Sequence, residues 1–312
     1  MEKKRRILCA VMCLLMLISP VMTAGAEAGV AFTDDLGREV TVAEHGRTAS
    51  LLGSFAEIWM LAGGEIIAAP DDAWEDLKLD LPEEAVNLGD TKSLSLEKLF
   101  EADPDFILAS VNTRQNVEWQ AVLENTDIPT AYFDVNGFAD YLRILDIFTD
   151  ITGRKDLYEK NGLSVQGQID AALERSRARL EENEAPSVLV VMASASMLKV
   201  KRSEGSVLGE MLKELGCVNI ADSEETLLEN LSIERIYEAD PDYIFFVQRG
   251  NDEEGMKEYV QKMLSDSPIW SILTAVKEEH VFFMEKNLYG LKPNHRWGEA
   301  YEKLEDILDD EK

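Results

Sequence analysis

Residues 94–107 read LSLEKLFEADPDFI, and residues 231–244 read LSIERIYEADPDYI. Nine of the fourteen positions are identical, and the other five exchange residues of similar shape or charge. The copies are 137 residues apart, which is too long for a solenoid repeat and typical of a duplicated domain. A weaker echo relates residues 54–63 to residues 206–216. The sequence therefore predicts two similar lobes.

Each copy predicts a short helix followed by a buried strand. Ser95 and Ser232 stand where a side chain caps a helix. Glu97 and Glu234 fall in the first turn, where the helix dipole favours a carboxylate. Asp-Pro-Asp then ends the helix, because the residue before proline disfavours the α conformation. Continuous apolar runs, typical of parallel strands buried on both faces, follow at 106–109 and 243–247.

The rest of the chain alternates strand and helix patterns, which is the signature of an α/β fold. Further strands are expected at 48–52, 66–69, 130–133, 188–192, 218–220 and 281–283. Helices are expected at 54–63, 115–124, 138–152, 206–215, 256–264 and 297–309. A hairpin that turns at Asp35-Leu36-Gly37 is expected over 31–42. The predicted fold is two Rossmann-like lobes with parallel-type sheets.

The first 26 residues have the pattern of a signal peptide. Four bases at 3–6 precede an apolar run at 7–18, and small residues at 24–26 offer a cleavage site. The run is shorter than a membrane-spanning helix needs, so a retained anchor is the less favoured alternative. Lipidation at Cys13 is also disfavoured, because Met12 before it is not small. We therefore expect an exported protein.

The expected boundaries follow from these patterns. The N-terminal lobe covers 27–152, and the C-terminal lobe covers 186–312. Between them, at 153–185, apolar residues recur at helical spacing among charged ones, which favours one long connecting helix over a flexible linker. Gly162 and Gly167 weaken the helical pattern in its first half.

Composition excludes several classes of protein. The formal net charge is −29, which argues against binding nucleic acid and disfavours docking on anionic lipid. Cys217 is the one cysteine left after residues 1–26, and its apolar surroundings predict a buried thiol. There is no G-x-S-x-G, HExxH, Walker A or GxGxxG motif, so we expect no catalysis.

The chain resembles the solute-binding proteins of ABC transporters for iron–siderophore, haem and cobalamin. The resemblance rests on FTDDLGREVT at 32–41, on the two Ser-x-Glu…Asp-Pro-Asp segments and on LKPNHRWGEAY at 291–301. It implies two lobes joined by a rigid helix, with the ligand in a cleft between them, in the periplasm or at the outer face of the cytoplasmic membrane. It also implies that Glu97 and Glu234 dock onto arginine pockets of a permease dimer that works with an ATPase. Their alternative role is to serve the helix dipole alone.

Candidate ligand contacts come from loops that follow the expected strands, because α/β sheets bind ligands beyond the carboxyl ends of their strands. Trp74, Tyr289 and Trp297 offer flat apolar surface, although Trp297 also begins a helix and is a candidate for the core. Four basic residues, suited to carboxylate or catecholate groups, stand in such loops: Arg114, Arg249, Lys292 and Arg296.

Ligand identity stays open at this point. The three histidines share no helical spacing, so a multi-histidine metal site is not expected. A ferric siderophore is the expected ligand, with haem or cobalamin as alternatives and His295 as the axial ligand if it is haem. We expect a monomer that delivers this chelate to the permease. A sensor or scaffold on the same fold is the competing function.

Overall fold

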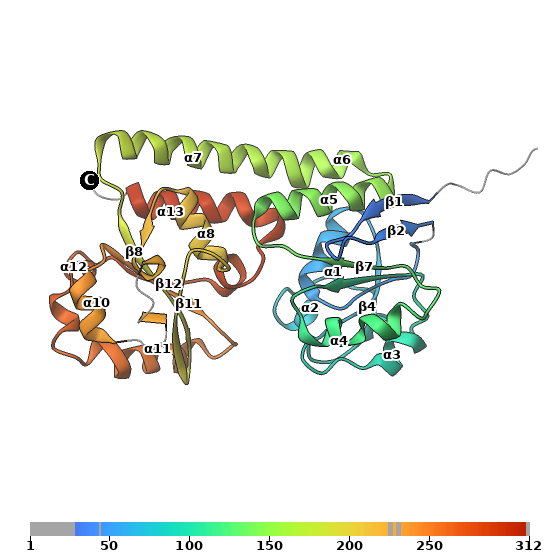
Figure 1. Cartoon of the computed structure of the whole chain (residues 1–312), viewed down its shortest axis with the longest axis horizontal. Helices are drawn as coiled ribbons and strands as arrows, with labels where there is room; N and C mark the ends of the chain where they lie inside the picture. Colours follow the sequence, from blue (N-terminus) through green and yellow to red (C-terminus); the bar gives the residue numbers. More distant parts are fainter. Residues whose placement is uncertain (1–28, 44, 224–226, 229–231, 310–312) are drawn as a thin grey trace, which may run out of the picture.

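The computed structural model describes residues 29–43, 45–223, 227–228 and 232–309. It has two α/β lobes, with one long helix running across both of them (Figure 1). The predicted signal peptide at 1–26 lies outside the described residues. The predicted fold class, two parallel-type α/β lobes and a connecting helix, is confirmed.

The N-terminal lobe is built on a five-stranded parallel sheet in the order β5-β4-β3-β6-β7. Its strands are β3 (Thr48–Ser50), β4 (Ile66–Ala69), β5 (Val86–Asn87), β6 (Phe106–Ser110) and β7 (Thr130–Phe133). One face packs against α1 (Gly53–Leu61) and α5 (Phe138–Thr152). The other face packs against α3 (Leu96–Glu101) and α4 (Arg114–Leu123). The expected strands at 66–69 and 130–133 and the helix at 138–152 have those bounds.

The C-terminal lobe has a sheet in the order β10-β8-β11-β12, all parallel, with β9 antiparallel to β8. Its strands are β8 (Ser187–Ser194), β9 (Met197–Lys201), β10 (Val218–Asn219), β11 (Tyr243–Gln248) and β12 (Val281–Met284). On one face lie α8 (Val207–Glu214) and α13 (Trp297–Asp309). On the other lie α10 (Ile233–Ala239), α11 (Glu253–Val260) and α12 (Thr274–Lys277).

The connecting helix has three parts without an interruption: α6 (Lys155–Tyr158), a π-helical turn (Glu159–Leu163) and α7 (Ser164–Glu182). Gly162 lies where a Cβ atom would stand 2.7 Å from Leu142 Cδ1 of α5. The glycine that weakens the helical pattern in the sequence therefore lets the connecting helix pack closely on the N-terminal lobe. Further along, α7 packs on α13 of the C-terminal lobe.

The repeated serines cap equivalent helices. Ser95 accepts a hydrogen bond from Lys98 N at 3.3 Å, and Ser232 accepts one from Arg235 N at 3.4 Å. Each capped helix buries one apolar residue in the core of its lobe, Leu99 in α3 and Ile236 in α10, and both are fully buried. The capping predicted from the sequence is confirmed in both lobes.

The repeated Asp-Pro-Asp segments also make equivalent contacts. Asp103 and Asp240 both adopt the left-handed conformation, with φ of 51° and 40°, and thereby turn the chain out of its helix. The second aspartate of each segment accepts a backbone N–H from the residue at the entry of the neighbouring strand. These pairs are Asp105 with Arg47 N at 3.1 Å and Asp242 with Ser187 N at 2.7 Å. The motif therefore joins helix, turn and sheet in the same way twice.

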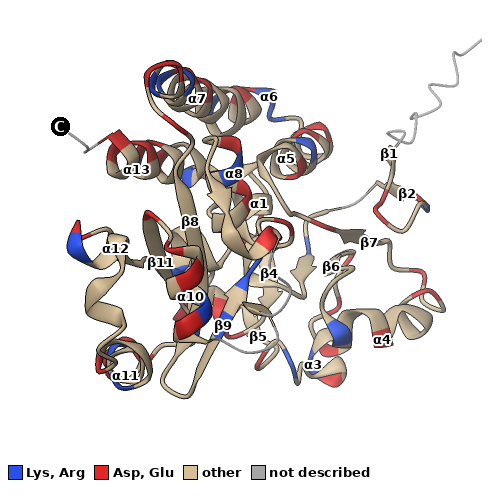
Figure 2. Cartoon of the chain, turned by 60° about the vertical axis from the view of Figure 1, so that its left-hand side comes forward, with Lys and Arg blue, Asp and Glu red and all other residues tan. Residues whose placement is uncertain are grey.

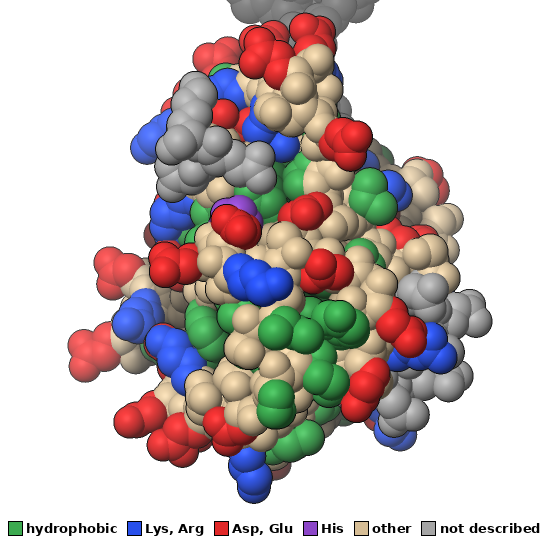
Figure 3. Space-filling model, turned by 90° about the vertical axis from the view of Figure 1, so that its left-hand side faces the viewer, with side chains coloured by type: hydrophobic (Ala, Val, Ile, Leu, Met, Phe, Trp, Pro, Cys, Tyr) green, Lys and Arg blue, Asp and Glu red, His purple; other side chains and the backbone are tan. Residues whose placement is uncertain are grey.

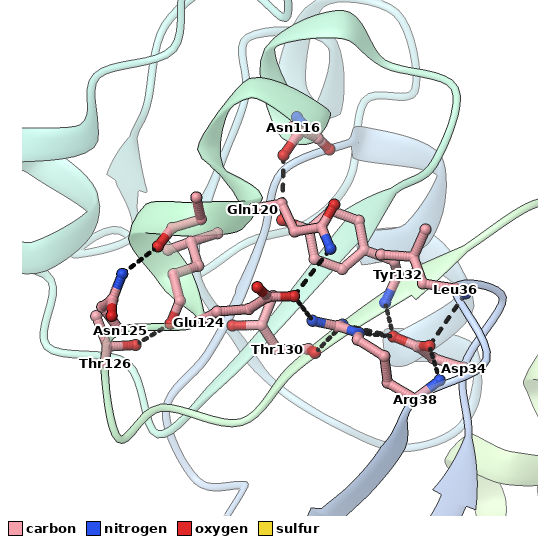
Figure 4. A network of polar contacts seen from close by, with 12 residues as sticks. Asp34, Leu36, Arg38, Asn116, Gln120, Glu124, Asn125, Thr126, Thr130 and Tyr132 are labelled. Carbon is pink, nitrogen blue, oxygen red and sulfur yellow. Dashed lines mark hydrogen bonds and ion pairs between the residues drawn. The ribbon is translucent and has the colours of Figure 1, made fainter.

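The predicted hairpin consists of β1 (Val30–Thr33) and β2 (Glu39–Val42). Its turn is fixed to the N-terminal sheet by Asp34, which accepts hydrogen bonds from Leu36 N, Arg38 and Tyr132 N (Figure 4). Arg38 also donates to Thr130 O at 2.9 Å, and its guanidinium lies 4.9 Å from the Tyr132 ring centroid. Burial opposes ionisation of Asp34, but the hydrogen bonds from Arg38 and Tyr132 outweigh it and lower the pKa of Asp34.

The variant Asp34→Asn is expected to lower the free energy of unfolding by about 2–3 kcal/mol at pH 7, because it removes a buried charge that is fully hydrogen-bonded. Since the pKa of Asp34 is lowered in the folded state, the stabilisation is present above the ordinary pKa and is lost as the pH falls through the folded value. Urea unfolding should therefore give a wide gap between wild type and variant at pH 7 and a narrow one near pH 3. The control Glu124→Gln removes the exposed partner of Arg38 and should change little. A gap of equal width at both pH values would contradict this account.

Candidate functional site

The two lobes contact each other through loops at the carboxyl ends of their strands. Lys286 follows β12, and its Nζ lies 2.8 Å from Asp76 Oδ1 at the end of α2 (Asp72–Glu75) in the N-terminal lobe. The same Nζ donates to Asn251 Oδ1 at 2.7 Å, and Asn287 Nδ2 donates to Asp76 O at 2.9 Å. Both charged side chains are less than one-fifth exposed, at 17% and 18%. This ion pair is therefore a partly buried bridge between the lobes.

The segment Lys-Pro-Asn-His-Arg at 292–296 makes a second bridge. Asn294 is fully buried and donates from Nδ2 to Ser54 O at 3.0 Å and to Glu57 Oε2 at 2.6 Å. His295 Nδ1 lies 3.4 Å from Glu57 Oε1, and the side chain of His295 is 43% exposed. This motif, predicted as a ligand loop, therefore also has a structural role between the lobes. His295 as an axial haem ligand stays a prediction.

Two of the predicted aromatic contacts lie in the core instead of on a loop surface. Trp297 is 1% exposed and packs against Phe138 and Tyr301. Tyr289 is 3% exposed, and its hydroxyl donates to Ala300 O at 3.2 Å. Burial raises the pKa of Tyr289, so the phenol stays protonated. Trp297 joins α13 to α5 and Tyr289 is tied to α13, so burial argues against the predicted role of both rings as ligand contacts.

Three other predicted contacts lie on three different helical elements. Trp74 is half-buried on α2 and packs against the core of the N-terminal lobe. Arg114 is 91% exposed at the start of α4 and pairs with Glu118 of the same helix at 2.7 Å. Arg296 pairs with Glu299 of α13 at 2.7 Å. The carboxylates beside Arg114 and Arg296 already neutralise these cations.

Lys292 and Arg249 have no such partner among the described residues. Lys292 Nζ lies 5.9 Å from the ring centroid of Phe55 in the N-terminal lobe, so the side chain reaches across between the lobes. Burial lowers the pKa of Lys292, although the charge of Asp134 opposes this. Arg249 directly follows β11, and its Nη1 lies 3.9 Å from Met192 Sδ of β8. Arg249 is exposed and Lys292 is half-buried between the lobes.

Two further cations, Lys199 and Lys201, were not predicted. They lie on β9, where Lys199 pairs in register with Met192, so they share the sheet face on which Arg249 contacts Met192. Val190, which lies opposite Lys201 on the same face, packs in the hydrophobic core that both lobes share. Burial, and then the charges of Lys199 and Arg249, lower the pKa of Lys201. In Figure 2 the ribbon of β9 carries the blue that marks Lys and Arg.

We name Lys199, Lys201 and Arg249 the cationic cluster. None of the three pairs with a carboxylate in the part of the chain that the structure describes, although the chain has 60 acidic residues. Like charges that repel one another without an acidic partner are suited to a ligand that carries several negative charges. The alternation of lysines with apolar residues at 197–201 was the signal in the sequence for this strand.

The two predicted docking carboxylates are both exposed and lie at equivalent places in α3 and α10. Glu234 Oε2 accepts a hydrogen bond from the Ser232 hydroxyl at 2.7 Å, which lowers the pKa of Glu234 and keeps it ionised. Figures 1 and 2 show α3 and α10 on the side of the molecule away from α7. Docking on a permease stays a prediction for both residues.

Three findings concern a metal site, a reactive cysteine and a membrane-spanning helix. No group of three or more His, Cys, Asp or Glu side chains within the described residues is placed to hold a metal ion. Burial raises the pKa of the Cys217 thiol to about 12, so it is not a nucleophile at neutral pH. Of the helices in the described ranges, none combines the length and apolar character needed to cross a membrane.

A hollow of about 530 Å³ lies between α5 and α7 and reaches Glu214 of α8. Its walls are largely apolar and include Phe138, Leu142 and Ile169. None of the predicted ligand residues lines it. It is therefore separate from the cationic cluster.

Known proteins resemble this chain in sequence and in its two-lobed fold. An iron-uptake system-binding protein of Bacillus subtilis is 24% identical over 231 residues, which cover 73% of this chain and 68% of the relative. The high-affinity heme uptake system protein IsdE of Staphylococcus aureus is 23% identical over 73% of this chain and 75% of its own. Staphylococcus aureus SirA complexed with staphyloferrin B has the same fold, with a TM-score of 0.68, 18% identity and coverage of 90% of this chain and 98% of SirA. The family model for periplasmic binding proteins matches residues 49–288, and the chain belongs to that family.

Proposed function

We propose that this protein captures an anionic ferric siderophore outside the cytoplasmic membrane and delivers it to an ABC permease dimer with its ATPase. The observation that carries the proposal is the cationic cluster, which has no acidic partner within the described ranges of a chain with a net charge of −29. Catecholate and carboxylate siderophores carry negative charge on their iron chelate, and basic side chains bind such groups.

The relatives favour the same ligand class. One relative is named for iron uptake, and the structurally similar SirA is complexed with staphyloferrin B. Lys292 of the C-terminal lobe, beside Phe55 of the N-terminal lobe, supplies a further cation between the lobes. We propose binding without turnover, by a monomer in the periplasm or at the outer face of the membrane.

Haem is the second candidate, and one specific observation favours it. His295 is 43% exposed at the bridge between the lobes, and imidazole is an axial ligand of haem iron. IsdE is named for heme uptake. In this alternative the cationic cluster would hold the haem propionates. Cobalamin is less favoured, because it offers fewer negative charges to the cluster.

A titration should separate these ligands. Protein 27–312 is titrated with ferric catecholate, ferric carboxylate and ferric hydroxamate chelates, haem and cobalamin, while tryptophan fluorescence and absorption are followed. Anionic ferric chelates should quench saturably and bind at least about tenfold more tightly than the hydroxamate, with weaker binding at high salt. A Soret shift that is lost in His295→Ala would show that the ligand is haem and not a siderophore. If no chelate binds at micromolar concentration, the proposed ligand class is wrong.

A further inference from the structure

Each predicted docking carboxylate has an exposed aromatic ring beside it. Phe100 is 38% exposed and stands three residues after Glu97, and Tyr237 is 48% exposed and stands three residues after Glu234. Residues three apart lie on the same face of a helix, so carboxylate and ring are neighbours in both lobes. Phe100 and Tyr237 also occupy the same position of the repeated segment.

Packing does not explain these rings. The residue before each one, Leu99 or Ile236, is fully buried and attaches the helix to its lobe. Neither Phe100 nor Tyr237 stacks on another ring in the part of the chain that the structure describes. Large exposed apolar side chains at matching places of two lobes indicate a contact that both lobes make.

The charges beside the rings define the partner. Glu101 and Glu238 stand four residues after Glu97 and Glu234, so two carboxylates share the side of the helix next to each ring. Glu238 already pairs with Arg235 at 2.7 Å, which leaves Glu234 as the carboxylate available beside Tyr237. An arginine is the side chain that complements this pattern, because its planar guanidinium binds a carboxylate with two hydrogen bonds and also stacks on an aromatic face. Lysines would pair with the carboxylates but would not stack on the rings, because the ammonium group is compact and strongly hydrated.

We propose that Phe100 and Tyr237 are stacking surfaces for arginines of the permease dimer, one in each lobe, and that Glu97 and Glu234 bind the same guanidinium groups. This inference rests on the proposed delivery to a permease. A two-fold symmetric permease presents two equal surfaces, and the two lobes present two equal patches to meet them. Aromatic residues and arginine are enriched in the energetically dominant parts of protein interfaces.

Another apolar surface lies on the outer end of the C-terminal lobe, where Figure 3 shows hydrophobic side chains gathered among acidic ones. Phe283 of β12 is 43% exposed and lines a hollow of about 300 Å³ with Trp270 and Val276. These residues lie outside the repeated segment, so they do not provide a pair of surfaces. They are not part of the proposed contact.

The test measures docking separately from ligand capture. Phe100→Ala/Tyr237→Ala is loaded with the chelate identified by titration, and its affinity for the permease–ATPase complex in nanodiscs is measured together with stimulation of ATPase activity. Docking should weaken about tenfold, and ligand affinity should stay within about twofold of wild type, because both rings are exposed. Phe100→Trp/Tyr237→Trp should restore docking. Leu163→Ala, at a residue that is 48% exposed on the connecting helix, is the matched control and should dock as wild type does.

Glu97→Ala/Glu234→Ala, measured in parallel, separates two kinds of failure. If this variant loses docking while Phe100→Ala/Tyr237→Ala docks like wild type, the aromatic contact is wrong and delivery to the permease stands. If wild-type protein loaded with its chelate does not bind the permease, the proposed delivery is wrong and the aromatic inference is overturned with it. If Phe100→Leu/Tyr237→Leu docks as well as Phe100→Trp/Tyr237→Trp, stacking is also overturned, because leucine restores only apolar area.

Discussion

Glu97→Ala/Glu234→Ala is expected to reduce uptake of the chelate by about 1,000-fold at limiting concentration of binding protein. Each substitution removes a charged hydrogen-bonding partner, worth about 1.5–3 kcal/mol, from a contact with the permease. Two such losses, about 4 kcal/mol together, correspond to the expected fold-change. Both side chains are exposed, and the hydrogen bond of Glu234 goes to Ser232 at the start of the same helix, so the fold and the ligand site should be unaffected.

Uptake is measured with labelled chelate in cells or in proteoliposomes that hold the permease and ATPase, and ligand affinity is measured on the purified variant. The matched control is Glu181→Ala/Glu182→Ala, which removes two exposed carboxylates from the end of α7. It should transport like wild type. Single substitutions should each give an intermediate loss if the two docking contacts are independent. Uptake at the wild-type rate in the double variant would show that these glutamates serve only their helices.

The repeated segments made the fold predictable because their interactions are local. The serine caps, the buried residue of each short helix and the turn at Asp-Pro-Asp all involve neighbours in the chain, so the sequence displays them directly. The strands with continuous apolar runs were equally visible, and β4 and β7 have the predicted bounds. Shorter elements such as β5 and α12, with two and four residues, are too brief to show a period.

The candidate site was predictable only in part, because exposure depends on contacts between distant segments. Trp297 follows an expected loop and looks available in the sequence, yet α13 brings it against Phe138 of the other lobe. Arg296 looks equally available until Glu299 binds it one turn later. In contrast, nothing beside Lys199 and Lys201 in the sequence marks them as site residues, because it is the pairing of β9 with β8 that brings them near Arg249. The unpaired state of a cation is a property of the fold and not of any one segment.

The cationic cluster leads to the second large effect. Lys199→Gln/Lys201→Gln/Arg249→Gln is expected to weaken binding of an anionic ferric siderophore by about 1,000-fold, since charge-assisted hydrogen bonds to a ligand contribute about 1.5–3 kcal/mol each and act together here. The salt dependence of the remaining binding should also fall, because fewer charges are neutralised. Fluorescence titrations at low and high salt measure both quantities.

Stability distinguishes a ligand site from a structural role. In wild type burial, and then the charges of Lys199 and Arg249, lower the pKa of Lys201, so the charge of Lys201 is opposed by both neighbouring cations in the folded state. Removing them should leave the ligand-free protein as stable as wild type or slightly more stable, whereas loss of structural ion pairs would destabilise it. The variant Arg114→Gln/Arg154→Gln/Lys257→Gln changes the net charge equally but removes cations that already pair with carboxylates. If this control weakens siderophore binding as much as the cluster variant does, overall charge and not the cluster holds the ligand. If the cluster variant binds the siderophore like wild type, Lys199, Lys201 and Arg249 are not part of the site.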